Sequence, residues 1–211
     1  MPSQQHPPIL LPLLVAMGLW LFMFSPWTAG LTNFWFTMAA AAMILSLLVL
    51  IFQPDSFGMA FAALNWRQCL QGLVLAVLLW LIFWTGDKVS SWLFGFAQRQ
   101  IDSIYDMKVG LSPWAIALLL LLVIGPAEEL FWRGFVQRDL SSRWGDNWGF
   151  IAATAIYTFI HLWSFNFMLI MSALVCGLVW GGLYRLRPKC LPALVVSHAV
   201  WDACVFVVFP I

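Results

Sequence analysis

Charged residues are scarce in this chain of 211 residues, where Asp, Glu, Lys and Arg together make up only 9%. An average soluble domain has roughly 25%. Hydrophobic residues reach 63%, and the mean hydropathy is +0.92. These proportions exclude an ordinary soluble domain and indicate an integral membrane protein.

An excess of charge of one sign is also absent. Ten Lys and Arg residues stand against nine Asp and Glu, so the formal net charge is +1. Proteins that bind nucleic acid through its phosphates need a concentrated positive field. We therefore expect no nucleic-acid partner.

Cysteine motifs are missing too, because the four cysteines are far apart and none forms a CxxC pair. Three of them lie in apolar runs, which is typical of small buried side chains. We expect neither a disulfide nor a thiolate metal site. The cysteines are Cys69, Cys176, Cys190 and Cys204.

Long hydrophobic runs are abundant. The hydrocarbon core of a bilayer, about 30 Å thick, needs roughly 20 apolar residues per helix. The chain as a whole, 1–211, is therefore predicted to be a single membrane domain, an all-α polytopic bundle of about seven helices. Because Met1 to Pro8 lack the basic residues of a signal peptide, the first helix is expected to be retained. The predicted spans are 9–24, 33–53, 69–86, 112–135, 148–163, 165–186 and 191–209.

Basic residues between the spans are distributed unequally. Seven fall on the side of the N-terminus, namely Arg67, Arg133, Arg138, Arg143, Arg185, Arg187 and Lys189. Three fall on the other side, namely Lys88, Arg99 and Lys108. Since cytoplasmic loops collect Lys and Arg, we predict a cytoplasmic N-terminus. A short chain of this kind with no eukaryotic targeting feature is expected in a bacterial cytoplasmic (inner) membrane.

Two further segments have recognisable patterns. Residues 87–110 mix acids with aromatic residues, which is typical of an amphipathic segment at the interface; gating of a site is the alternative.

Ala173, Gly177 and Gly181 recur every four residues and predict a close helix contact. That contact could lie within one protomer or between two, so the oligomeric state is left open.

Ionisable residues inside spans are costly and are therefore candidates for function. Pro126 lacks a backbone N–H, so the helix loses one hydrogen bond to the carbonyl of Leu122 and should kink just before the two acids. Glu129 and Arg133 are four residues apart and should face each other, whereas Glu128 points about 100° away and stays free for chemistry. The alternative is a helix end with solvated carboxylates and a snorkelling arginine.

Two histidines complete the set of ionisable groups. His161 ends an apolar run one helical turn after Tyr157, and His198 precedes Asp202 by four residues, on the same helix face. Asp202 could accept a hydrogen bond from His198 and fix its tautomer, or, if protonated, donate one to an oxyanion. Because charges are so few, we predict that these helices converge on one site.

Three motifs in this order resemble the CAAX-protease and bacteriocin-processing family of intramembrane endopeptidases, also called the Abi family. The resemblance covers residues 112–209 and leaves 1–111, the N-terminal helices and interfacial segment, outside. It implies a helical fold with a catalytic cavity inside the membrane domain. The motifs are EExxxR at Glu128, Glu129 and Arg133, FxxxH at Tyr157 to His161 with tyrosine for phenylalanine, and HxxxD at His198 to Asp202.

The resemblance implies peptide-bond hydrolysis in a membrane-associated peptide or protein. We expect Glu128 to act as general base on a water that His161 also holds, while His198 and Asp202 polarise the carbonyl. The alternative places Zn²⁺ on Glu128, His161 and His198. Because no HExxH sequence occurs, the metal-free form is preferred.

Two other classes of function stay open. One is a non-proteolytic membrane protein that binds a peptide or confers bacteriocin immunity. The other is an ion-coupled transporter that uses Glu128, Glu129 and Asp202 as a proton relay, although the chain lacks the internal repeat of many transporters. The name of the family that the motifs resemble suggests prenylated tails as substrates, but for a bacterial chain leader peptides or C-terminal sorting helices are the preferred expectation.

Overall fold

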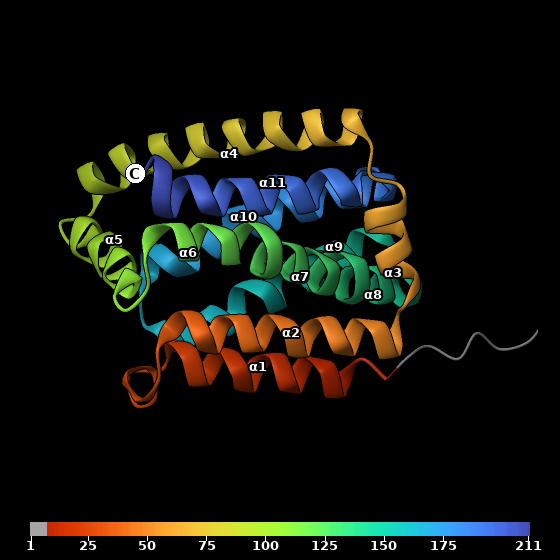
Figure 1. Cartoon of the computed structure of the whole chain (residues 1–211), viewed down its shortest axis with the longest axis horizontal. Coiled ribbons are helices and arrows are strands. Elements are labelled where there is room, and N and C mark those ends of the chain that lie inside the picture. The colour runs from red at the N-terminus through yellow and green to blue at the C-terminus, as the bar shows by residue number, and fades with distance from the viewer. Residues whose placement is uncertain (1–7) are drawn as a thin grey trace, which may run out of the picture.

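The computed structural model describes residues 8–211, so the prediction for Met1 to Pro8 falls almost wholly outside the described residues. Over that range the chain contains helices and no strand. Most of the helices run nearly parallel or antiparallel to one another in one bundle (Figure 1). The predicted all-α polytopic bundle is confirmed.

The first half of the bundle consists of α1 (Leu10–Phe24), α2 (Phe34–Phe52), α3 (Asp55–Phe57), α4 (Trp66–Leu93) and α5 (Ala97–Tyr105). The second half consists of α6 (Pro113–Leu119), α7 (Gly125–Glu129), α8 (Arg138–Trp144), α9 (Asp146–Phe159), α10 (Phe167–Leu186) and α11 (Leu191–Ala203). The helices α6, α7 and α8 form one continuous helical stretch, joined by π-helical turns at Leu120–Ile124 and Leu130–Gln137.

Within residues 8–211, each predicted span coincides with a helical stretch. Five stretches are long and apolar enough to cross a membrane, judged by length and composition: Phe34–Phe52, Trp66–Leu93, Pro113–Trp144, Phe167–Leu186 and Pro188–Val208. The helix α1 has 15 residues and is shorter. The fifth predicted span corresponds to α9 and the 3₁₀ turn Ile160–Ser164 that follows it.

The bounds of α4 differ from the prediction. The side chain of Asn65 accepts hydrogen bonds from the backbone N–H groups of Arg67 and Gln68, so the helix begins three residues earlier than predicted. It also continues through residues 87–93, which were assigned to the interface. A single glycine, Gly86, costs a helix only about 1 kcal/mol, too little to end it. The amphipathic part is α5, which crosses the end of the bundle (Figure 1).

Close backbone contacts bring the helices of the site together. A Cβ atom on Gly125 of α7 would lie 2.6 Å from the Cα atom of Ala199 on α11, so only glycine permits this approach. On α10, a Cβ atom at Gly177 would lie 2.9 Å from Thr154 of α9. The predicted small-residue contact is therefore confirmed, and it forms within the chain.

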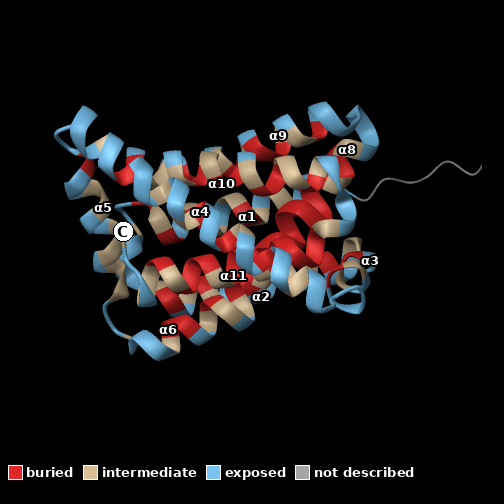
Figure 2. Ribbon diagram, turned by 90° about the horizontal axis from the view of Figure 1, so that it is seen from above, coloured by how far each residue is buried: buried red, intermediate tan, exposed pale blue. Residues whose placement is uncertain are grey.

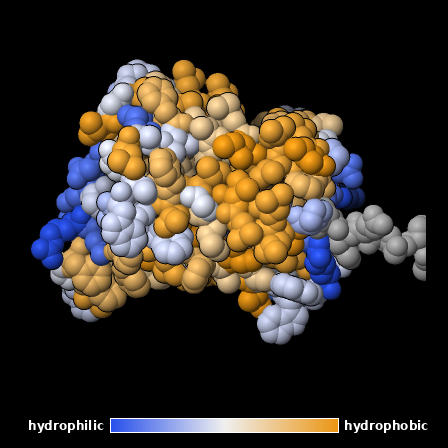
Figure 3. Space-filling model, turned by 90° about the horizontal axis from the view of Figure 1, so that it is seen from below, coloured by the Kyte–Doolittle hydropathy of each residue, from blue (hydrophilic) through white to orange (hydrophobic). Residues whose placement is uncertain are grey.

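The surface suits a bilayer. Figure 2 shows buried residues gathered inside the bundle and exposed residues around its ends. On the face drawn in Figure 3, hydrophobic side chains dominate the middle and hydrophilic side chains gather towards both ends. Hydrophobic side chains that lie exposed on the outside of a bundle are the arrangement that lipid requires. The chain is an integral membrane protein.

Candidate active site

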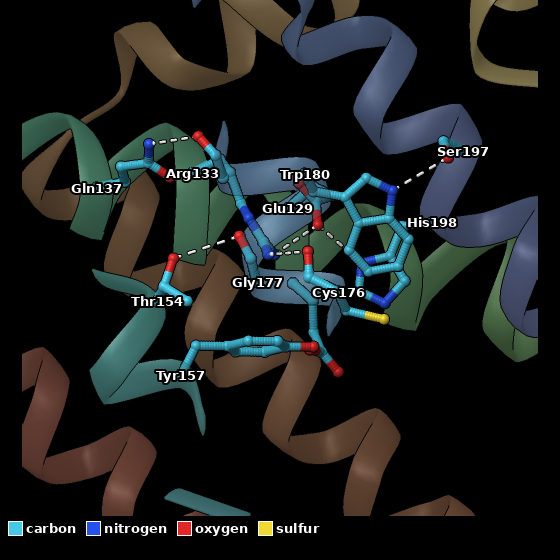
Figure 4. A network of polar contacts seen from close by, with 12 residues as sticks. Glu129, Arg133, Gln137, Thr154, Tyr157, Cys176, Gly177, Trp180, Ser197 and His198 are labelled. Carbon is cyan, nitrogen blue, oxygen red and sulfur yellow. Dashed lines mark hydrogen bonds and ion pairs between the residues drawn. The ribbon is translucent and has the colours of Figure 1, made fainter. Parts of the chain in front are cut away.

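Glu129 of α7 is the centre of a buried polar network. Its Oε1 atom lies 2.7 Å from Nη1 of Arg133 and 2.9 Å from Nδ1 of His198. Figure 4 shows the two cationic side chains converging on this carboxylate. The predicted pairing of Glu129 with Arg133 is confirmed, and the contact of Glu129 with His198 had not been predicted.

Arg133 contacts a backbone carbonyl and two aromatic rings in addition to Glu129. It donates to the backbone carbonyl of Cys176 at 3.3 Å, and its guanidinium lies over the rings of Tyr157 and Trp180, at 4.9 and 5.5 Å from their centroids. Its side chain is only 2% exposed. A buried charge is tolerated when it is paired and hydrogen-bonded, and Arg133 meets both conditions.

His198 lies between two carboxylates. Its Nδ1 atom faces Glu129, and its Nε2 atom lies 3.4 Å from Oδ2 of Asp202. Trp180 of α10 stacks on the imidazole with ring centroids 4.1 Å apart, and its indole N–H donates to Ser197. Carboxylates accept hydrogen bonds, so a histidine between two of them is suited to donate from both nitrogens as a cation.

His161 has a different environment. Its Nδ1 atom lies 2.8 Å from the backbone carbonyl oxygen of Tyr157, and its Nε2 atom accepts from the indole N–H of Trp20 at 3.2 Å. A carbonyl oxygen only accepts and an indole N–H only donates. These partners therefore fix a neutral imidazole with its proton on Nδ1.

Two tryptophans of the site were not predicted. Trp20 comes from α1 and Trp180 from α10, and no spacing in the sequence connects either of them with a histidine. Both are almost fully buried in a chain with 14 tryptophans. A buried indole needs a partner for its N–H group, but the sequence does not say which one.

One cavity of about 490 Å³ is lined by four of the catalytic candidates. Its polar lining includes Glu128, His161, His198 and Asp202, whereas Glu129 and Arg133 lie behind the wall. Most other lining residues are apolar, and the volume is that of a ligand pocket. The predicted division between a free Glu128 and a paired Glu129 agrees with this geometry.

The positions of the possible metal ligands show whether this structure fits the alternative zinc site. Among residues 8–211, no group of three His, Cys, Asp or Glu side chains is placed to hold one metal ion. The Nε2 lone pair of His161 is taken by Trp20, and both nitrogens of His198 face carboxylates. In this arrangement Glu128, His161 and His198 do not fit a zinc ion.

Tyr157 occupies the position at which the resembling motif has phenylalanine. Its hydroxyl donates to Oε2 of Glu128 at a long 3.4 Å, and its ring packs against Trp132 and Arg133. We expect Tyr157→Phe to change the cleavage rate by less than about threefold, because a phenyl ring keeps the packing and a long hydrogen bond contributes little. A cleavage assay on purified protein measures this rate. A loss above tenfold would instead make the hydroxyl part of the chemistry.

The comparison with known proteins agrees with this geometry. A protein-family model described as type II CAAX prenyl endopeptidase Rce1-like matches residues 110–204, the part of the chain that carries all three motifs. No curated protein and no solved structure matched the chain. The description of this family model points to a protease. Residues 110–204, a little less than half of the chain, are thus similar to the CAAX-protease family that the motifs resemble.

Proposed function

We propose that the protein is an intramembrane endopeptidase that hydrolyses a peptide bond in a membrane-associated peptide or protein. The observation that carries this proposal is the cavity of about 490 Å³, in which Glu128, His161, His198 and Asp202 meet among apolar side chains. Hydrolysis needs a base for water, a donor for the oxyanion and a proton for the leaving amine. These four groups can supply all three.

In the proposed reaction, Glu128 takes a proton from a water molecule that lies between it and His161. The water oxygen attacks the scissile carbonyl, and the cationic His198, held by Glu129, shifts its Nε2–H from the long 3.4 Å contact with Asp202 to the oxyanion that forms. Glu128 then passes its proton to the leaving nitrogen as the C–N bond breaks. Water must compete with the Trp20 indole for Nε2 of His161.

Proteolysis can be tested while the substrate is still unidentified. Peptide termini are compared between membranes of the native host that contain wild-type protein or Glu128→Gln at equal levels. We expect a set of termini that is present with the wild type and lost with the variant, and the sequences next to them would identify the cut site. Identical sets of termini would favour a peptide-binding or immunity protein instead.

Metal dependence is the second test. We expect cleavage by purified protein to persist after dialysis against EDTA or treatment with 1,10-phenanthroline, because the histidine nitrogens are engaged by other partners. The residual rate should stay within about twofold of the untreated rate, since no step of the proposed chemistry uses a Lewis acid. Loss of activity that zinc restores would overturn the metal-free mechanism.

A further inference from the structure

The cavity contains a second carboxylate that the proposed chemistry does not use. Asp87 lies near the end of α4, and it lines the same cavity as Glu128. Its neighbours in the wall include Ser90 of α4 and Tyr105 of α5. The cavity therefore extends from the catalytic cluster to the end of the bundle where α4 meets α5 (Figure 1).

Asp87 is buried without a full set of partners. It is only 8% exposed, and among residues 8–211 no hydrogen-bond donor reaches its Oδ1 atom. An unpaired carboxylate oxygen in an apolar wall is costly, and buried acids are normally paired. Because Asp87 lines the cavity, a rotation of its carboxylate would bring this buried oxygen to a donor that enters there.

The partner of the other oxygen is weakly held. Oδ2 lies 2.8 Å from Nζ of Lys88, but the Lys88 side chain is 63% exposed. Ion pairs with such an exposed partner contribute little, and the lysine can leave its position at low cost. Lys108, another cation at this end, lies with its Nζ atom 4.5 Å from the centroid of the Tyr105 ring.

The electrostatic effect of Asp87 extends to α5. Burial raises the pKa of Tyr105, and the negative charge of Asp87 raises it further. Tyr105 accepts a hydrogen bond from the backbone N–H of Ile211 at 3.0 Å. The negative charge thus lies at the junction of α4, α5 and the last residues of the chain, where a peptide in the cavity would pass.

We propose that Asp87 forms a charge-selective subsite that binds a lysine or arginine side chain of the peptide substrate. The inference rests on the proposed endopeptidase function and adds a substrate class to it. The apolar walls of the cavity bind apolar side chains of the peptide, and the catalytic cluster binds the scissile bond. Asp87 pairs with a basic residue that lies a fixed number of positions from the scissile bond. A divalent metal would need several oxygen ligands, whereas one carboxylate suits an organic cation.

The test uses synthetic apolar peptides that carry one lysine at successive positions, with a parallel set that carries glutamine instead. Purified protein cleaves each set, and mass spectrometry gives the cut sites and kcat/KM. For one lysine position we expect the wild type to prefer lysine over glutamine by about tenfold or more, the effect of a hydrogen bond to a charged group. Asp87→Asn should bring this ratio close to one.

A second variant keeps the test decisive if Asp87→Asn does not fold. Lys88→Gln removes the ammonium that competes for Asp87, so it should keep the preference for lysine or raise it by no more than about fivefold, because an ion pair with an exposed partner is weak. A wild-type ratio near one, a preference that survives Asp87→Asn, or a lower preference with Lys88→Gln would each overturn the subsite.

The same assay separates the two proposals. Cleavage of both peptide sets at equal rates, abolished by Glu128→Gln, would remove the subsite and leave the endopeptidase in place. If the wild type cuts neither these peptides nor any host protein in the comparison of termini, the proposed function itself fails.

Discussion

Glu128→Gln should reduce the cleavage rate by about 10²- to 10⁴-fold, the usual contribution of a positioned general base. Glutamine has nearly the same shape as glutamate but cannot take a proton from water. The thermal stability of the variant should match that of the wild type, because within residues 8–211 the only side-chain hydrogen bond of Glu128 is the long one from Tyr157. Single-turnover kinetics and thermal unfolding in the same detergent measure both quantities.

The neighbouring residue provides a matched control. Glu129→Gln makes the same chemical change one position later, but Glu129 is fully buried and binds both Arg133 and His198. We expect this variant to lose stability as well as activity. If Glu128→Gln kept most of the activity, or if the two variants behaved alike, the division of roles between the two acids would be wrong.

Arg133→Met should lower the free energy of unfolding by roughly 3–5 kcal/mol, the usual cost of removing one partner of a buried ion pair. Methionine keeps much of the length of the side chain but leaves the carboxylate of Glu129 with His198 as its remaining cation. The hydrogen bond to the carbonyl of Cys176 is also lost. Equilibrium unfolding in detergent micelles measures the change.

Arg138→Met is the control for this prediction. The Arg138 side chain is 33% exposed, and it lies 4.0 Å from Asp55, which is 77% exposed. An ion pair of this kind contributes at most about 1 kcal/mol. If Arg133→Met cost no more than Arg138→Met, the buried ion pair of Arg133 with Glu129 would not contribute more to stability than an exposed one.

Most of the fold could be predicted from the sequence because every segment that crosses the bilayer must be a helix of roughly 20 mostly apolar residues. Runs of apolar residues located the spans, but α4 continues to Leu93 and the stretch from α6 to α8 continues to Trp144, beyond the predicted ends at residues 86 and 135. The structure also differs where individual contacts determine a helix end. The start of α4 depends on the Asn65 cap, and α3 is too short for hydropathy to detect. The hydroxyl of Ser56 in α3 donates to the carbonyl of Gly134 at 2.6 Å, a contact between residues that are distant in the sequence.

The candidate site was only partly predictable. Spacing of four residues correctly paired Glu129 with Arg133, because the geometry of one helix determines that contact. Contacts between helices could not be derived in the same way. The approach of His198 to Glu129 depends on the glycine contact between Gly125 and Ala199, and the contact of Trp20 with His161 depends on how α1 packs.

The position of Trp20 has a consequence for how the protein can be divided and recombined. Residues 110–204 carry the three motifs, but Trp20, Trp35 and Asp87 in the cavity wall come from the N-terminal half. An excised motif region would lack one wall of this cavity. A chimera that exchanges residues 1–109 with those of a relative would acquire a different binding surface, but it would also have to keep Trp20, because its indole N–H binds Nε2 of His161 in the other half.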